Sequence, residues 1–193
     1  MSILVILFRT KQVLSQHFNM PKTLKKPVNS RCVFTDHETR SGLRQKRKLG
    51  SFINEVIFSY TKKENNVSYT FLTDDALLEM NIEFLNHDTY TDIITFDLSD
   101  DVANTILGDI YISADRVREN AKNLAVTFQD ELLRVILHGA LHLSGYGDKT
   151  KKDKEVMRGL ESSWMDAYKS KTFIEVAVSK RLGSPLFEER GRG

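Results

Sequence analysis

Apolar residues recur along this chain with two periods, which predict strands and helices in alternation. A period of two predicts a strand over residues 67–71, where Val67, Tyr69 and Phe71 alternate with polar residues. Residues 62–66 before it are polar and predict a turn. A period near 3.6 predicts a helix over about residues 43–61, with an apolar face made of Leu49, Ile53, Val56, Ile57 and Tyr60.

The same patterns predict the remaining elements. We expect strands at 31–34, 91–98 and 106–112, because these runs are apolar or rich in β-branched residues. Capping residues precede three further predicted helices, namely Thr73, Ser113 and Thr127. The spacing of apolar residues indicates a last helix through Val156, Met157, Leu160 and Trp164. This order predicts an α+β (α/β-like) single domain, in which helices pack on a small mixed β-sheet.

Length and composition fit one domain with extensions. The chain has 193 residues, and its 40% hydrophobic content is enough for one core. We expect an N-terminal extension outside the fold at 1–21, the domain at 22–168 and a flexible tail at 169–193. The alternatives are an N-terminal strand within 1–19 and a short strand or helix at 173–178. The apolar run 3–8 is too short to span a bilayer and lacks secretory-signal features, and the single cysteine, Cys32, suits a reducing cytosol.

Candidate chemistry is concentrated in residues 138–148, which read HGALHLSGYGD. Two histidines four residues apart, His138 and His142, share one face of a helix and can therefore bind one ion. Gly145 is a natural helix-terminating residue, so the chain can turn back and bring Asp148 beside the two imidazoles. Two nitrogens and one oxygen, with a fourth position open, form the ligand set of a catalytic zinc ion.

This motif has two other interpretations, chance spacing and a zinc protease. Histidines with this spacing also occur by chance on helix surfaces or as satisfied core residues. The zinc-protease pattern H-E-x-x-H is also similar, but Gly139 stands where its glutamate base would be, which argues against a protease. The apolar helix and the glycine-rich turn carrying a carboxylate favour metal binding over chance.

The motif resembles that of a known family. The run 138–148 is similar to H-G-x-L-H-L-x-G-Y-D-H of the YbeY family, bacterial metal-dependent endoribonucleases that act in small-subunit ribosomal RNA maturation. The stretches 80–96 and 107–113 resemble two further family motifs, so that the resemblance covers roughly residues 30–165. It implies a small mixed sheet with the metal-site helix in a cleft, and makes residues 22–168 the family-like domain.

Two residues depart from the family pattern. Asp148 replaces the third histidine, and a carboxylate is an acceptable zinc ligand. Leu85 replaces the family's arginine, and Arg134, one turn before His138, is our candidate substitute, with a solvated or salt-bridged helix arginine as the alternative. Residues 22–48 are basic, and clustered Lys and Arg residues attract the phosphate backbone of nucleic acids. The alternative is a helix face whose charges are simply solvated. The candidate RNA-binding residues are therefore Arg134, Lys46, Arg47 and Lys48.

The resemblance implies a cytoplasmic, zinc-dependent, single-strand-specific endoribonuclease. It would use one Zn²⁺ ion, mature the 3′ end of 16S rRNA and take part in ribosome quality control. Its partners would be ribosomal RNA and the small subunit, with no membrane and no DNA. The alternative is a non-catalytic ribosome-assembly factor with a structural metal. No catalytic residue is assigned, because the only nearby candidate base is Glu131, for which a structural ion pair is the other interpretation.

Overall fold

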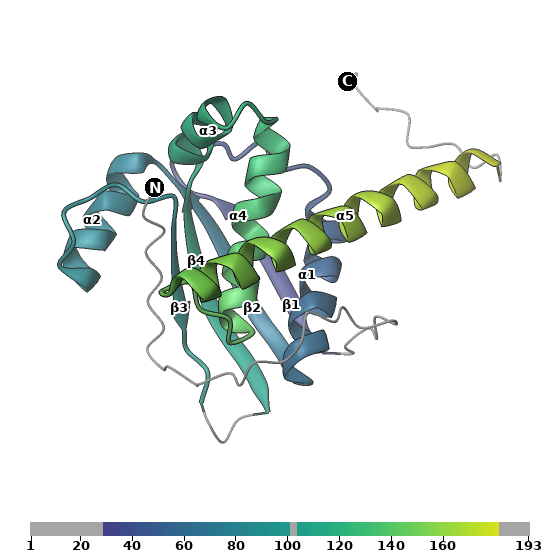
Figure 1. Ribbon diagram of the computed structural model, residues 1–193, viewed down its shortest axis with the longest axis horizontal. Helices are drawn as coiled ribbons and strands as arrows, with labels where there is room; N and C mark the ends of the chain where they lie inside the picture. Colours follow the sequence, from purple (N-terminus) through teal and green to yellow (C-terminus); the bar gives the residue numbers. More distant parts are fainter. Residues whose placement is uncertain (1–28, 101–103, 182–193) are drawn as a thin grey trace, which may run out of the picture.

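The helices and strands follow one another in the predicted order (Figure 1). The computed structural model describes residues 29–100 and 104–181, with side chains as far as residue 170. The elements are β1 (Arg31–Asp36), α1 (Lys46–Thr61), β2 (Glu64–Leu72), α2 (Asp74–Leu85), β3 (Ile93–Asp97), β4 (Thr105–Ser113), α3 (Ala114–Asn123), α4 (Phe128–Leu143) and α5 (Lys151–Arg181).

The four strands form one mixed sheet in the order β1-β2-β4-β3. β2 pairs in parallel with both β1 and β4, with Tyr69 opposite Ile110 in the second pair. β3 runs antiparallel to β4, and Ile93 lies opposite Ile112. This mixed sheet packed with helices confirms the predicted α+β fold class.

The two faces of the sheet are covered differently, because alternate strand residues point to opposite sides. One face carries Val67, Tyr69 and Ile110 and packs against α1, α4 and α5 to form the main core. Figure 1 shows α4 over this face, with α5 crossing it. The other face carries Ile94 and packs against α2 in a smaller cluster. The helix with the histidine motif therefore lies on the more deeply covered face.

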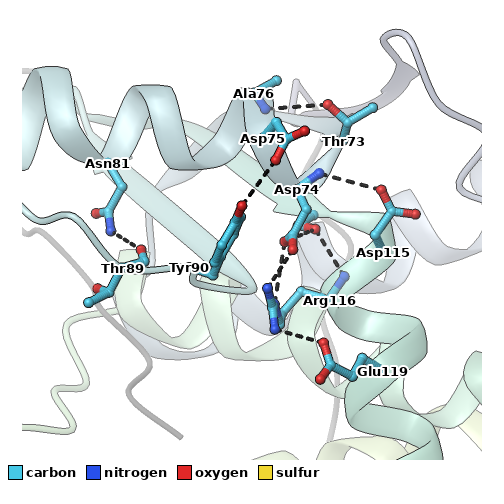
Figure 2. Close-up of polar contacts among 11 residues, drawn as sticks. Thr73, Asp74, Asp75, Ala76, Asn81, Thr89, Tyr90, Asp115, Arg116 and Glu119 are labelled. Atoms are coloured by element: carbon cyan, nitrogen blue, oxygen red, sulfur yellow. Dashed lines mark hydrogen bonds and ion pairs between the residues drawn. The ribbon is translucent and has the colours of Figure 1, made fainter.

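The predicted caps of α2 and α3 are confirmed at the carboxyl edge of the parallel strands. The Thr73 hydroxyl accepts a hydrogen bond from the Ala76 N–H, and the Ser113 hydroxyl accepts one from the Arg116 N–H, at 3.3 and 3.0 Å. The Arg116 guanidinium also binds the Asp74 carboxylate (Figure 2). These contacts join the starts of two helices that are distant in sequence.

Two predicted element starts are wrong by about three residues. α1 begins at Lys46, not near residue 43, because Gln45 adopts a left-handed conformation with φ of 52° and offers no side-chain cap. β2 begins at Glu64, inside the predicted turn, because the Ser30 hydroxyl holds this segment beside β1. That hydroxyl donates to the Glu64 carboxylate at 2.7 Å and accepts from the Asn65 N–H at 2.9 Å. Tertiary pairing thus overrides the polar character of residues 64–66.

The two ends of the chain are only partly described. α5 continues to Arg181, which makes residues 173–178 helical and not a strand. Residues 1–28 and 182–193, which hold the expected N-terminal extension and part of the expected tail, lie outside the described residues. Among the described helices, none has the length and apolar character needed to cross a membrane.

Candidate metal centre

α4 holds His138 and His142 on one face, a single turn apart. The helix starts as predicted at Thr127, whose hydroxyl accepts from the Asp130 N–H at 3.1 Å and donates to the Asp130 carboxylate at 2.7 Å. Both imidazoles are buried, with 2% and 1% of their surface exposed. Most of the residues around them in α4 belong to the main core, so the rotation of the helix is fixed.

Gly139 brings this part of α4 close to the sheet. A Cβ atom at this position would lie 3.0 to 3.2 Å from side-chain atoms of Ile110 and Ile93. A larger residue would therefore push the helix away from the sheet or strain the core. The glutamate of the zinc-protease pattern would start against these two core isoleucines, which would have to shift to accommodate it.

The turn after α4 ends the helix and returns the chain toward the histidines. Gly145 adopts a left-handed conformation with φ of 93°, and its N–H donates to the His142 carbonyl at 2.8 Å. The Tyr146 N–H donates to the Leu141 carbonyl at 3.1 Å, which completes a Schellman motif. The Tyr146 carbonyl in turn lies 2.7 Å from His142 Nδ1. The turn that leads to Asp148 thus also orients one imidazole.

The structure brings His138, His142 and Asp148 together. One ligand atom from each residue lies within 4.8 Å of the other two, and the two Nε2 atoms are 2.7 Å apart. Tetrahedral zinc, with bonds of about 2.0–2.2 Å, holds its ligand atoms roughly 3.3–3.6 Å apart. Shifts on the order of 1 Å would therefore place all three around one ion. The residues fit a site with two nitrogen ligands, one oxygen ligand and an open position.

Burial sets the protonation of the site. It lowers the pKa of His142 to about 3, helped by the charge of His138 and opposed by the Tyr146 carbonyl. Neutral imidazole, the form that binds metals, is therefore the form of His142 at physiological pH. Burial raises the pKa of Asp148, while the charges of His138 and Lys154 act in the opposite direction. A bound cation would favour the Asp148 carboxylate in the same way.

A chain of charged side chains lies behind His138. Its Nδ1 atom is 2.6 Å from Oε1 of Glu161, a buried carboxylate on α5. The other Glu161 oxygen lies 3.5 Å from Nη1 of Arg134. Arg134 also binds the Glu131 carboxylate, with Nε donating to Oε2 at 2.9 Å. The predicted structural ion pair of Glu131 is thus present, and this carboxylate is only 1% exposed.

Comparison with known protein families identifies the family of this chain. The family model described as endoribonuclease YbeY matches residues 33–169. The chain belongs to the YbeY family.

Curated relatives named endoribonuclease YbeY agree with this assignment. A protein of Cytophaga hutchinsonii is 47% identical over 134 residues, which cover 67% of this chain and 90% of the relative. A protein of Porphyromonas gingivalis is 50% identical over 117 residues, which cover 61% and 76%. The solution structure of TM1509 from Thermotoga maritima superposes with a TM-score of 0.53 at 24% identity, covering 84% of this chain and 99% of that chain. That likeness shows a shared fold.

The stretch 80–96, the second YbeY-like motif, divides between the two faces of the sheet. Leu85 packs in the smaller cluster beside α2. Asp92 is buried and accepts a hydrogen bond from Asn120 Nδ2 at 3.1 Å. Burial raises the pKa of Asp92, and the charges of His138 and Arg134 oppose this rise. Asp92 therefore lies within electrostatic range of the metal centre, whereas Leu85 belongs to the other face.

The other predicted RNA-binding residues lie away from the metal centre. Lys46, Arg47 and Lys48 form the first turn of α1, where Lys46 pairs with Asp36 at 3.5 Å. The segment before α1 meets the start of α4, since Gln129 Nε2 donates to the Gly42 carbonyl at 3.1 Å. At 1.5 Å of rise per helical residue, His138 and His142 lie about 14–20 Å from Gln129 along the axis of α4.

Glu161 was not identified as a site residue from the sequence, although the sequence carries a signal for it. The residue falls on the buried stripe of α5 with Met157, Leu160 and Trp164. A carboxylate on an apolar stripe is expected to have a partner. Which partner it has depends on the packing of α5 against α4, and no local pattern shows that packing.

Proposed function

We propose that the protein is a zinc-dependent endoribonuclease that cleaves single-stranded RNA, with ribosomal RNA of the small subunit as its substrate. Maturation of the 3′ end of 16S rRNA, ribosome quality control and a cytoplasmic location are parts of this proposal. Membership of the endoribonuclease YbeY family supports RNA cleavage. The observation that carries the metal-dependent part is the convergence of His138, His142 and Asp148.

Each of the three residues contributes to holding one divalent ion. His142 is neutral, and its Nδ1 atom faces the Tyr146 carbonyl, which leaves Nε2 to the ion. His138 is oriented in the same way by Glu161, and Asp148 adds a negative charge. A zinc ion held there would lower the pKa of a bound water and polarise a phosphodiester. Burial of both histidines excludes bulk water from the inner side of the site.

Arg134 is the proposed cation for the phosphate nearest the metal. Its carboxylate partners hold the guanidinium in place, and 22% of the side chain stays exposed. A guanidinium has five N–H donors, so pairs with Glu131 and Glu161 leave donors for a phosphate. Lys46, Arg47 and Lys48 would bind the backbone further along the strand.

The decisive experiment is RNA cleavage by zinc-loaded protein. Single-stranded RNA carrying an immature 16S 3′ end should be cut, the same sequence in a duplex should be spared, and His138→Ala should abolish cutting. Arg134→Ala should lower the cleavage rate more than RNA affinity. Neutralising Lys46, Arg47 and Lys48 together should flatten the dependence of log affinity on log salt concentration. Zinc and RNA binding without cleavage would instead support the alternative, a ribosome-assembly factor with a structural metal.

A further inference from the structure

Glu161 is a buried carboxylate whose two oxygens are both engaged. It lies on α5, 23 residues beyond His138, and only 5% of its side chain is exposed. Oε1 faces the His138 imidazole, and Oε2 faces the Arg134 guanidinium. Burying a carboxylate in an apolar core is unfavourable unless a positive charge and hydrogen bonds compensate. Arg134 supplies the charge, which leaves the other oxygen available to act on the histidine.

The two imidazoles are held by different acceptors in the same manner. His142 Nδ1 faces a backbone carbonyl at 2.7 Å, and His138 Nδ1 faces a carboxylate oxygen at 2.6 Å. A carbonyl and an ionised carboxylate can only accept, so each Nδ1 must carry the hydrogen. In a neutral imidazole this leaves a lone pair on Nε2. Both Nε2 atoms point toward the same place, 2.7 Å from each other.

We propose that Glu161 is a positioning residue of the metal centre, which fixes His138 as its Nδ1–H tautomer and aims Nε2 at the ion. The inference rests on the proposed metal site. Carboxylates that accept from a metal-binding histidine orient its ring and make it more basic, and their loss weakens metal affinity by about 10–100-fold. Arg134 also contributes to this positioning, because it is the cation that keeps Glu161 in place. Glu161 therefore couples the metal ligand to the arginine beside it.

Glu131 provides a matched control for the test. It is also a buried carboxylate bound to Arg134, and among the described residues no hydrogen bond or ion pair joins it to either histidine. Glu161→Gln and Glu131→Gln each remove one negative charge next to the same guanidinium. If Glu161 only balanced the charge of Arg134, the two variants would have the same zinc affinity. If Glu161 acts by positioning His138, only Glu161→Gln should lower the zinc affinity.

The experiment measures zinc affinity of the full-length protein by competition with a chromophoric chelator. It also measures the histidine tautomers by ¹⁵N NMR of the zinc-free protein. Glu161→Gln should lose about 10–100-fold in zinc affinity and shift His138 toward the Nε2–H tautomer, because an amide N–H can donate to Nδ1. Glu131→Gln should stay within about twofold of the parent protein and keep the tautomer. Equal losses in both variants, or no change in Glu161→Gln, would overturn the proposal.

A second variant covers the case in which Glu161→Gln does not fold. Glu161→Asp keeps the charge for Arg134 but shortens the reach toward His138, so weaker zinc binding is again expected and parental affinity would overturn the role. The outcomes also separate this inference from the proposed function. A parent protein that binds no zinc contradicts both. One that binds zinc with the predicted Glu161 effect but cleaves no RNA contradicts the proposed function alone.

Discussion

Two arginines, Arg134 and Arg116, each bind two carboxylates, and the comparison shows how burial changes what an ion pair can do. The arginine side chains are equally exposed, at 22% and 23%. The partners of Arg134 are 1% and 5% exposed, whereas those of Arg116 are 23% and 56% exposed. We call these groups the Arg134 cluster (Glu131, Arg134, Glu161 and His138) and the Arg116 cluster (Asp74, Arg116, Glu119 and Tyr90).

The Arg116 cluster serves the fold. Asp74 accepts from Arg116 and from the Ser113 hydroxyl, so that it links the starts of α2 and α3. The Tyr90 ring centroid lies 4.8 Å from the guanidinium, and the Tyr90 hydroxyl donates to the Asp75 carboxylate at 3.2 Å (Figure 2). The contacts of Asp74 and Tyr90 join α2, α3 and the loop before β3, and water competes with them. In the Arg134 cluster, water is largely excluded, and one carboxylate oxygen is directed to a histidine. Similar ion pairs therefore connect the starts of two helices in the Arg116 cluster and orient a histidine side chain in the Arg134 cluster.

The largest expected difference is in stability. Arg134→Met should lower the free energy of unfolding by about 3–5 kcal/mol, because it leaves two buried carboxylates without their cation. Arg116→Met, at matched exposure, should lower it by about 1 kcal/mol, because solvent can take over its partners. Urea denaturation of the zinc-free proteins measures both. Equal losses would show that burial of the carboxylates does not separate the two clusters.

Metal binding should distinguish the clusters next. Zinc at about 100 times its dissociation constant should stabilise the protein by roughly 2.7 kcal/mol, and Arg116→Met should keep this gain. Asp148→Ala should lose most of it at the same zinc concentration, whereas Asp148→His should retain it. Thermal unfolding with and without zinc provides the measurement. An undiminished gain in Asp148→Ala would exclude this residue as a ligand.

The pH dependence of Asp92 should report the low polarity beside the Arg134 cluster. Burial raises its pKa in the folded state above the ordinary value of 3.8, so the folded protein binds this proton more tightly than the unfolded chain. The contribution of Asp92 is therefore most favourable below about pH 3.8 and diminishes as pH rises through its folded pKa. The stability of Asp92→Asn relative to the parent should increase from acid to neutral pH. A flat difference would mean that the carboxyl is not desolvated.

The smallest effect, with the opposite sign, is expected at the exposed pair of Asp130 and Lys169. Lys169 and the Thr127 hydroxyl hold the pKa of Asp130 below 3.8. This stabilisation is present above about pH 3.8 and is lost as pH falls through the folded pKa. Lys169→Met should therefore cost at most about 1 kcal/mol at neutral pH and nothing in strong acid. A larger loss, measured by urea denaturation, would contradict the screening assumed for surface pairs.

Local signals in the sequence predicted much of this molecule. The order of elements, the caps at Thr73, Ser113 and Thr127, and the turn at Gly145 each depend on residues within a few positions of one another. The spacing of His138 and His142 placed them on one helical face for the same reason. Such features need no knowledge of the tertiary structure.

The parts that sequence reasoning missed depend on contacts between distant segments. The start of β2 is held by Ser30, about 35 positions away in the chain. The partner of His138 is Glu161, which reaches it only because α5 crosses α4. Arg134 was predicted to face RNA or to form a salt bridge; its partner Glu131 is an i, i+3 neighbour on α4, but its second partner, Glu161, lies on α5. Packing of α5 on α4 decides both contacts of Glu161, the one with His138 and the one with Arg134.

X-ray absorption spectroscopy at the zinc edge tests the proposed metal centre, because it counts the ligands of a bound ion. We expect one zinc ion per chain, with two imidazole nitrogens and a carboxylate oxygen at about 2.0–2.2 Å. In His142→Ala, one imidazole contribution should disappear while the protein stays folded. A zinc ion without imidazole ligands in the parent protein, or one that keeps both imidazoles in His142→Ala, would contradict a centre built on His138, His142 and Asp148.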